Sequence, residues 1–318
     1  MAKPQLLVGD IGGTNARFAV AEPGGAVRDV EILAVAEHES FDAALRQYLK
    51  GLGERPAAFS VASAGIRRGD TVHLTNAPWS LGESALCTEF GFEQVCIFND
   101  FEAQARFAGT LKDQGCLILK EGTPIEGAPV LTVGPGTGFG QAVYLPGNPG
   151  RVAATEGGHR LMPVRDAREL RLFERVSEEQ GYPAILEEAL SGRGIVNFYR
   201  VLIDDRGEVA RCATPPEITS AALDAPGTER DAVLWFLDML ACAAADACFS
   251  TGARGGVVIS GGITPRLVPL LKAFDFASAF ARPGVLHDYL AQVPVRLVTE
   301  PHAALYGAAS LMHDRAGH

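Results

Sequence analysis

Two stretches of the chain share one uncommon pattern: an apolar strand, a glycine-rich turn containing Gly-Thr, and a second strand. The first comprises the strand Gln5–Val8, the turn Asp10–Asn15 and the strand Arg17–Val20. The second comprises the strand Val130–Val133, the turn Gly134–Gly140 and the strand Gln141–Tyr144. When Gly13-Thr14 is laid over Gly136-Thr137, the strands on both sides align. Because a repeated supersecondary unit indicates a duplicated domain, the sequence predicts two related halves that face each other across a cleft.

The length and the other expected elements agree with two α/β domains. At 318 residues the chain exceeds the roughly 250–300 residues at which one hydrophobic core stops growing. Strand patterns alternate with helical ones, which indicates an α/β fold. The further expected elements are a strand over Val27–Val35, a helix capped by Ser40, a strand over Ala57–Ala62, a helix opened by a capping box of Ser80 and Glu83, a buried strand over Val95–Phe98, a mainly helical region from Asp166 to Gly252, a strand over Val257–Ser260 and a helix begun by Pro265.

Charge and hydropathy argue against two classes of partner. The formal net charge of −10 disfavours nucleic acid, because phosphate backbones attract surfaces rich in Lys and Arg. The most apolar long segment, Leu234–Phe249, is interrupted by Asp238 and Asp246 and falls short of the roughly 20 apolar residues of a membrane span, so it predicts a buried helix. The six cysteines form no C-x-x-C pair, which indicates reduced residues of a cytoplasmic protein.

The first glycine turn has the features of a phosphate cradle. Gly12 and Gly13 let the backbone approach a bulky anion and direct N–H groups at it, and the side chains of Thr14 and Asn15 add hydrogen bonds. Asp10 repels a bare phosphate, so its presence makes sense if Mg²⁺, or a water on Mg²⁺, lies between the two. The alternative is a tight hairpin in which Asp and Gly serve turn geometry alone.

Two further glycine turns follow buried strands. Gly134, Gly136 and Thr137 form a second candidate phosphate cradle, although no Gly-Lys-Ser/Thr follows and the turn is therefore not a P-loop. Gly261 and Gly262 follow the end of a strand, where a nucleotide can rest on an α/β sheet. Either turn can also be a plain connection between a strand and the next element.

Asn99 and Asp100 follow a buried strand directly. Transfer of a phosphoryl group to a hydroxyl requires a carboxylate within hydrogen-bond reach of the attacking oxygen, and Asp100 is the candidate. The alternative is that Asp100 only caps a helix that starts at Phe101.

A third set of polar residues suits a sugar. Glu156 and His159 flank two glycines, so both side chains can converge on one polyol, and Glu187 near the end of a helix before Ser191-Gly192 can join them. Carboxylates and imidazoles hold sugar hydroxyls in fixed directions and reject analogues that lack the hydroxyl. The alternative for His159 is a surface or packing role.

Seven segments carry a resemblance to a known family: Gly9–Arg17, Leu74–Trp79, Phe98–Phe101, Gly134–Gly138, Glu156–His159, Leu190–Tyr199 and Ile259–Arg266. Together they resemble the bacterial glucokinase family, within the actin-like ATPase and sugar kinase superfamily, and they follow the family's order over nearly the whole chain. The cysteine-rich zinc motif of the related family of repressors and kinases is absent. The chain is therefore similar to the zinc-free glucokinases, and a transcriptional role is disfavoured.

The resemblance implies a two-domain actin-like, ribonuclease H-like fold. The small domain would comprise residues 1–108 and, through a returning helix at about Pro301–His313, residues 301–318. The large domain would comprise residues 109–300. The family also implies a homodimer.

The resemblance further implies a role for each candidate residue. Asp100 would be the general base on the 6-hydroxyl of glucose, while Asn99, Glu156, His159 and Glu187 would bind the other hydroxyls; Glu188 adjoins Glu187 and leaves open which of the two faces the sugar. The turns at Gly12–Asn15 and Gly134–Thr137 would hold the phosphates of ATP, and Gly261-Gly262 would lie near the adenosine. Mg²⁺ would be held through ATP and water, with no set of protein ligands.

The expected function is ATP-dependent phosphorylation of glucose to glucose 6-phosphate. Two alternatives stay open: a kinase that prefers another hexose, and a sugar sensor on the same fold without turnover. The presence of Asp100 and of both phosphate turns counts against the sensor, since a sensor of sugar alone needs no ATP cradle.

Overall fold

A computed structural model describes residues 5–22, 25–53, 55–75, 77–111 and 115–316. Asn76, in the segment Leu74–Trp79, lies outside the described residues. The chain divides into two compact units: unit 1 comprises Met1–Thr110, Asn148–Val152 and Glu300–His318, and unit 2 comprises Leu111–Gly147 and Ala153–Thr299. The domain limits given above, 1–108 with 301–318 and 109–300, stay a prediction.

Unit 1 is built on a five-stranded mixed sheet. Its strands, in sheet order, are β3 (Val27–Ala34), β2 (Asn15–Ala21), β1 (Leu6–Ile11), β4 (Ala58–Ser63) and β8 (Gln94–Asn99). β1 and β2 form an antiparallel hairpin, whereas β1, β4 and β8 run parallel. The carboxyl ends of these three parallel strands therefore meet at one edge of the sheet, where the turn after β1 and the pair Asn99-Asp100 both lie.

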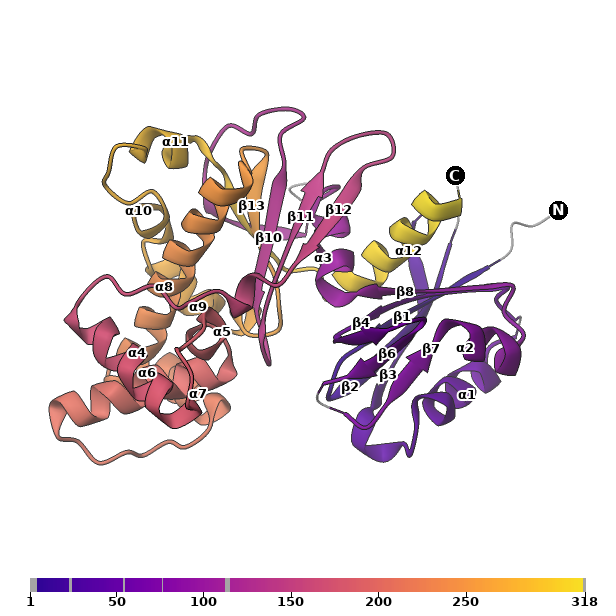
Figure 1. The fold of residues 1–318 in the computed structure, drawn as a ribbon, viewed down its shortest axis with the longest axis horizontal. Helices are drawn as coiled ribbons and strands as arrows, with labels where there is room; N and C mark the ends of the chain where they lie inside the picture. The colour runs from indigo at the N-terminus through magenta and orange to yellow at the C-terminus, as the bar shows by residue number, and fades with distance from the viewer. Residues whose placement is uncertain (1–4, 23–24, 54, 76, 112–114, 317–318) are drawn as a thin grey trace. The chain divides into compact units, whose positions relative to one another are not determined.

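Helices cover both faces of this sheet (Figure 1). Alternate residues of a strand point to opposite faces: Leu7 and Phe18 pack with one pair of helices, and Val8 and Ala19 pack with the other. The first pair is α1 (Phe41–Gly51) and α2 (Glu83–Phe90), and the second pair is α3 (Asp100–Ala108) and α12 (Ala303–Ala316). Ser40 caps α1 by accepting a hydrogen bond from the Ala43 N–H, as predicted.

The predicted capping box at Ser80 and Glu83 is wrong. Ser80 belongs to β7 (Ser80–Gly82), which forms a small antiparallel sheet with β6 (Thr71–Leu74) and β5 (Gly65–Arg68). The N-cap of α2 is Gly82, which has no side-chain bond to the helix. The carboxylate of Glu83 instead accepts a hydrogen bond from the backbone of Ile97 in β8, so a contact distant in sequence overrides the local pattern.

Unit 1 also contains a close helix crossing that depends on one glycine. A Cβ on Gly307 of α12 would lie 1.9 Å from the carbonyl oxygen of Ala103 in α3. We expect Gly307→Ala to lower the free energy of unfolding by about 1–3 kcal/mol, because overpacking forces the two helices apart. Urea denaturation measures this change.

Gly51→Ala is the matched control for this prediction. Gly51 ends α1, and a Cβ added there would have no heavy atom within 4 Å, so alanine should be neutral or should stabilise the helix by up to about 1 kcal/mol. Equal stability of the two variants would contradict the tight crossing.

Unit 2 contains a six-stranded sheet and the longer helices. Its strands, in sheet order, are β12 (Arg151–Thr155, of which Arg151 and Val152 are counted with unit 1), β11 (Phe139–Leu145), β10 (Val130–Pro135), β13 (Gly256–Ile259), β14 (Val295–Val298) and β9 (Cys116–Lys120). The helices are α4 (Ala167–Gln180), α5 (Leu186–Ala189), α6 (Gly192–Arg206), α7 (Pro215–Asp224), α8 (Thr228–Thr251), α9 (Val268–Ala273), α10 (Phe276–Phe280) and α11 (His287–Gln292). Short 3₁₀ turns are η1 (Val35–Glu37) in unit 1 and η2 (Gly157–His159) and η3 (Thr264–Leu267) in unit 2.

The two sheets repeat one topology. In each, the first strand of an antiparallel hairpin (β1 of β1–β2, or β10 of β10–β11) has a parallel strand on its other side, which is β4 or β13. The orders β3-β2-β1-β4 and β12-β11-β10-β13 therefore match position for position. This match confirms that the two strand–turn–strand patterns belong to sheets of the same topology, as a duplicated domain would have.

The predicted buried helix over Leu234–Phe249 is also confirmed. It lies within α8, which is long and apolar enough to cross a membrane, but 78% of its apolar window is buried inside the protein. Such burial is typical of the core helix of a globular unit.

Candidate active site

The first glycine turn is shorter than predicted. Asp10 lies in β1 and Asn15 begins β2, so only Gly12, Gly13 and Thr14 connect the two strands. The reason is a cross-strand pair: Asp10 faces Arg17 in the hairpin register, and Arg17 Nη1 donates to Asp10 Oδ2 at 2.9 Å. The turn is closed by a hydrogen bond of 3.0 Å from the Gly12 N–H to the carbonyl oxygen of Asn15. Gly13 and Thr14 are exposed.

The charge of Asp10 is already partly balanced within unit 1. Burial raises the pKa of the Asp10 carboxyl, while the charge and hydrogen bond of Arg17 and the charge of His302 oppose this rise. Among the residues that the structure describes, no group of three or more His, Cys, Asp and Glu could hold a metal ion. Mg²⁺ near Asp10 therefore stays a prediction, and it would depend on phosphate and water for most of its ligands.

Sequence reasoning gave no role to Arg17 or His302. Arg17 could have been found, because a hairpin closed by Gly12–Thr14 pairs it directly with Asp10. His302 could not, since it precedes α12, almost 300 residues later in the chain than Asp10.

Asp100 does not cap its helix, so that alternative is wrong. α3 begins at Asp100, and its N-cap is Asn99, whose Oδ1 accepts hydrogen bonds from the N–H groups of Phe101 at 2.9 Å and Glu102 at 3.4 Å. The Glu102 carboxylate in turn accepts a hydrogen bond from the Asn99 N–H, which completes a capping box. Asp100 is thus held half-buried in the first turn of α3.

In unit 2 the second and third glycine turns lie against each other. The second turn is also shorter than predicted: Gly134 belongs to β10 and Phe139 begins β11, so only Gly136, Thr137 and Gly138 connect the two strands. β10 and β13 are parallel neighbours, so Gly134, near the end of β10, and Gly261, just after β13, lie at the same edge of the sheet. A Cβ on Gly134 would lie 2.6 Å from the carbonyl carbon and oxygen of Ser260, and one on Gly261, whose φ is +85°, would lie 2.5 Å from the Pro135 carbonyl oxygen. Only glycine permits this contact at both positions. Beyond it, Thr137 and Gly262 are exposed.

The carboxylate of Glu187 packs against the second glycine turn. Its Oε2 accepts a hydrogen bond of 2.9 Å from the Phe139 N–H and occupies the space of the absent Cβ of Gly138, at 2.3 Å. The Gly192 N–H donates to the carbonyl oxygen of Gly136 at 3.0 Å, so the segment that carries Glu187 is attached to the turn twice.

The helix boundaries around Glu187 differ from those predicted. Glu187 lies in the first turn of α5, and Ser191 does not end this helix but caps the next one, α6, by accepting from the Gly194 N–H. Glu188 is only 2% exposed, whereas Glu187 is 21% exposed, and Arg193 lies 3.4 Å from a carboxylate oxygen of each. The greater exposure favours Glu187 over Glu188 as the residue that meets a ligand.

Glu156 and His159 project from a tightly held turn. Their side chains are 87% and 63% exposed, and His159 Nε2 lies 4.0 Å from Glu156 Oε2. The two glycines between them pack on β11: a Cβ on Gly157 would lie 2.3 Å from Gln141 Oε1, and one on Gly158 would lie 2.4 Å from the Phe139 carbonyl oxygen. Phe139 therefore contacts both the Glu156–His159 turn and Glu187, and unit 2 brings these three predicted sugar residues onto adjoining segments.

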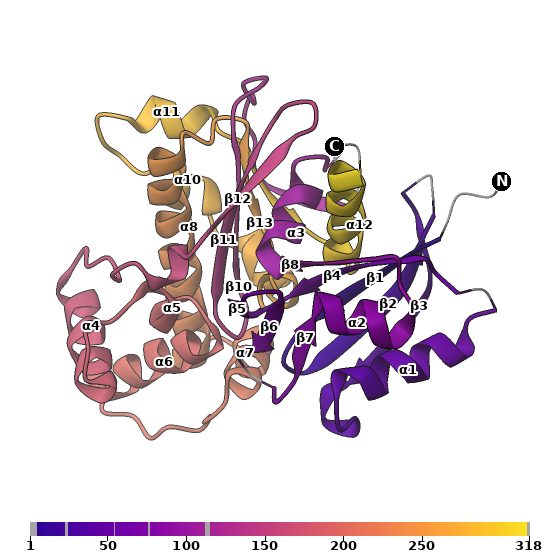
Figure 2. The same ribbon diagram turned by 45° about the vertical axis from the view of Figure 1, so that its right-hand side comes forward.

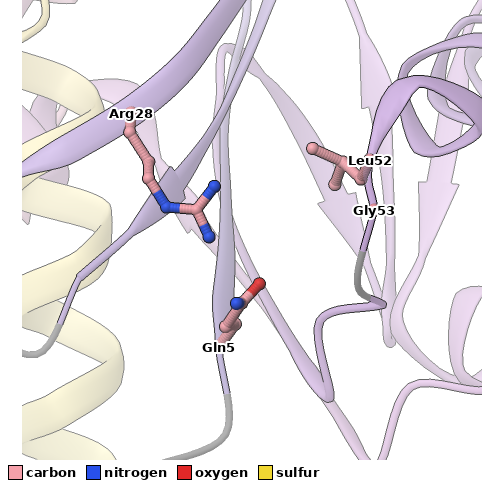
Figure 3. A pocket seen from close by; sticks show the side chains of 4 residues that line it. All are labelled: Gln5, Arg28, Leu52 and Gly53. Atoms are coloured by element: carbon pink, nitrogen blue, oxygen red, sulfur yellow. The ribbon is translucent and has the colours of Figure 1, made fainter.

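The hollow in Figure 3 does not contain any of these residues. It is lined by Gln5, Arg28, Leu52 and Gly53 of unit 1, with the polar ends of Arg28 and Gln5 facing the space. Gln5 precedes β1, so the hollow lies at the end of this strand away from Gly12–Thr14.

Comparison with known proteins gives one consistent family. The glucokinase family model matches residues 7–315. The glucokinase of Chromohalobacter salexigens is 38% identical over 317 residues, which cover 99% of both chains. Among solved structures, a glucokinase from an Antarctic psychrotroph has a TM-score of 0.85 and 31% identity, covering 98% of this chain and 99% of the other.

A more distant structural neighbour shares the fold. The ROK family glucokinase from Streptomyces griseus in complex with glucose and AMPPNP has a TM-score of 0.65 and 20% identity, covering 96% of this chain and 98% of the other. The predicted α/β, two-domain actin-like sugar kinase fold is confirmed by these neighbours. With a family match over nearly its whole length and full-length relatives at this identity, the chain belongs to the glucokinase family.

Proposed function

We propose that the protein is a glucokinase that transfers the γ-phosphoryl group of ATP to D-glucose, giving glucose 6-phosphate and ADP. Membership in the glucokinase family over residues 7–315 carries this proposal. A kinase of the same fold has been solved with glucose and AMPPNP, so the fold accommodates a sugar and an ATP analogue. The reaction would supply the first sugar phosphate of glycolysis in the cytoplasm.

Asp100 is the proposed general base. Its carboxylate takes the proton of the 6-hydroxyl while the hydroxyl oxygen forms a bond to the γ-phosphorus and the bond from that phosphorus to the β–γ bridging oxygen breaks. The first turn of α3 suits this role, because the helix N-terminus stabilises a negative charge. Asn99 fixes the start of α3, and its amide is the proposed contact to another hydroxyl.

Glu156, His159 and Glu187 are the proposed ligands of the remaining hydroxyls. The high exposure of Glu156 and His159 leaves their polar atoms accessible, and the rigid glycine packing beneath them limits the entropy lost on binding. Glu187 is the proposed link between sugar and nucleotide, since its carboxylate also holds the turn at Phe139.

The glycine turns are the proposed sites for ATP. Gly12, Gly13, Thr14 and Asn15 in unit 1 and Gly134, Gly136 and Thr137 in unit 2 would hold phosphates, with Gly261 and Gly262 near the adenosine. The space at Gly12 and Gly136 supports this: a Cβ there would meet its nearest heavy atom only at 3.7 or 4.0 Å, so the backbone at these two glycines is open to approach. Mg²⁺ bound to ATP would supply the positive charge that the phosphates need, near Asp10. A homodimer is the proposed assembly.

The sugar-specificity profile tests the choice of substrate. We expect kcat/KM with Mg-ATP to be highest for glucose and lower by about 10-fold or more for mannose, fructose and glucosamine, because polar groups that a bound sugar covers but leaves unpaired reject the wrong sugar. Sugar-dependent formation of ADP measures it. A higher kcat/KM for another hexose would move the proposal to that sugar, and sugar binding without turnover would support the sensor.

A further inference from the structure

The outer edge of β8, the strand that leads into Asp100, is held by side chains. β8 ends the order β3-β2-β1-β4-β8, and β4 is its only neighbour among the described strands of that sheet. Figure 2 shows β8 continuing directly into α3. Because an edge strand presents unpaired N–H and C=O groups, the outward-facing groups of β8 need other partners.

One ion pair satisfies both backbone groups of Ile97. Glu83 Oε1 accepts a hydrogen bond of 2.9 Å from the Ile97 N–H, and Arg67 Nη2 donates to the Ile97 carbonyl oxygen. Arg67 Nη2 also lies 3.2 Å from Glu83 Oε1. The Arg67–Glu83 pair thus takes the place that an adjacent strand would occupy.

The next outward-facing residue of β8 is held in the same way. The Asn99 N–H donates to Glu102 Oε2 at 3.4 Å, as part of the α3 capping box. Burial raises the pKa of the Glu102 carboxyl, and the hydrogen bond from Asn99 and the charges of Arg315 and Arg67 oppose this rise. Arg67 therefore acts on both sides of Asn99. It donates a hydrogen bond to the carbonyl oxygen of Ile97, and its positive charge favours the ionised carboxylate of Glu102.

We propose that Arg67 and Glu83 are positioning residues for Asp100. They hold β8 at Ile97, three residues before Asp100, and thereby set the position and direction of the first turn of α3. This role rests on the proposed function, because it takes Asp100 as the base. A displacement of about 1 Å of a catalytic group lowers the rate by about 100-fold, so loss of the pair should reduce kcat.

The charge attraction within this pair contributes little to the stability of the fold. The side chains of Arg67 and Glu83 are 42% and 25% exposed, and exposed ion pairs add little to folding because water replaces the partner. Loss of the hydrogen bonds to Ile97 lowers the unfolding temperature by a few degrees, so the signature of a positioning role is a loss of kcat in a variant that stays folded under the assay conditions.

Four variants test the proposal. Arg67→Ala and Glu83→Ala should each lower kcat by about 10- to 100-fold, with KM for Mg-ATP within about twofold of wild type. Arg67→Lys keeps the positive charge and a nitrogen that can donate to the Ile97 carbonyl, and Glu83→Gln keeps an oxygen that can accept from the Ile97 N–H. Each should therefore have a higher kcat than the corresponding alanine variant. Amide hydrogen exchange at Ile97 and Asn99 should be faster in the alanine variants.

Arg46→Ala is the matched control. Arg46 and Glu89 form an ion pair in the same unit, with side chains 53% and 42% exposed, and neither touches β8 in the described contacts. The control should keep wild-type kcat, and its unfolding temperature should lie within a few degrees of that of Arg67→Ala.

The outcomes separate this proposal from the proposed function. If wild type forms no sugar phosphate, the proposed function fails and the positioning role fails with it. If wild type turns over and the alanine variants keep its kcat, or if all four variants lose stability and activity together without rescue, the positioning role alone is overturned. Should an alanine variant not fold, Arg67→Lys and Glu83→Gln decide: faster amide exchange at Ile97 and Asn99 with wild-type kcat overturns the role, and a lower kcat in a folded variant supports it.

Discussion

Asp100→Asn is expected to lower kcat for glucose phosphorylation by about 100- to 10,000-fold, the range that a positioned general base contributes. The amide has the size of the carboxylate but does not accept the proton of the 6-hydroxyl. Because Asn99 and Glu102 form the capping box of α3, the helix should keep its start in the variant. KM for Mg-ATP should stay within about threefold of wild type, since Asp100 does not hold the nucleotide in this account. Initial rates over both substrates measure these values.

Asp42→Asn is the control for the general effect of removing a carboxylate. Asp42 lies in the first turn of α1, as Asp100 lies in the first turn of α3, and both helices belong to unit 1. The two variants lose the same favourable interaction with a helix N-terminus, but only Asp100→Asn should lose kcat. Equal kcat in wild type and Asp100→Asn would remove Asp100 from the base role.

The second large effect is expected at the glycine turn of unit 2. Gly134→Ala should reduce the free energy of unfolding by about 1–3 kcal/mol, because its Cβ would lie 2.6 Å from the Ser260 carbonyl group. The end of β10 would have to separate from Ser260-Gly261, so we also expect a loss of activity with Mg-ATP. Thermal unfolding and KM for Mg-ATP measure both changes.

Gly136→Ala, two residues along, separates folding from nucleotide binding. Its Cβ would meet no heavy atom closer than the Gly138 carbonyl oxygen at 4.0 Å, so stability should equal that of wild type. If the turn holds phosphates against its backbone, the added methyl group should raise KM for Mg-ATP by about tenfold, or about 1.4 kcal/mol, and leave KM for glucose unchanged. An unaltered KM for Mg-ATP would show that phosphates do not approach this turn.

The sequence predicts most of the fold because its signals are local or repeated. Hydrophobic runs mark β1, β8 and β10, Ser40 marks the start of α1, and the two Gly-Thr turns predict the topology that both sheets share. Prediction fails where a contact distant in sequence competes with a local pattern. Ser80 pairs in β7 and Glu83 binds the Ile97 N–H, although the spacing of these two residues is typical of a capping box.

For the site, the sequence predicts which residues to consider but not how the protein holds them. The pairing of Gly134 with Gly261 follows from two parallel strands that are more than 100 residues apart in the chain. The bond from the Phe139 N–H to Glu187 and the ion pair of Arg67 and Glu83 beside Ile97 join segments whose proximity depends on packing. No spacing rule includes such contacts, so Arg67, Arg193 and His302 were found only in the structure.

The identity of the product decides whether the protein phosphorylates glucose at the 6-hydroxyl with Asp100 as the base. The purified protein is incubated with glucose and Mg-ATP, and the phosphorylated products are identified by phosphorus NMR. We expect glucose 6-phosphate and ADP in equal amounts, formed by wild type and by Asp42→Asn but about 100-fold or more slowly by Asp100→Asn. Formation of inorganic phosphate and ADP without a sugar phosphate, or of a sugar phosphorylated at another hydroxyl, would contradict this expectation.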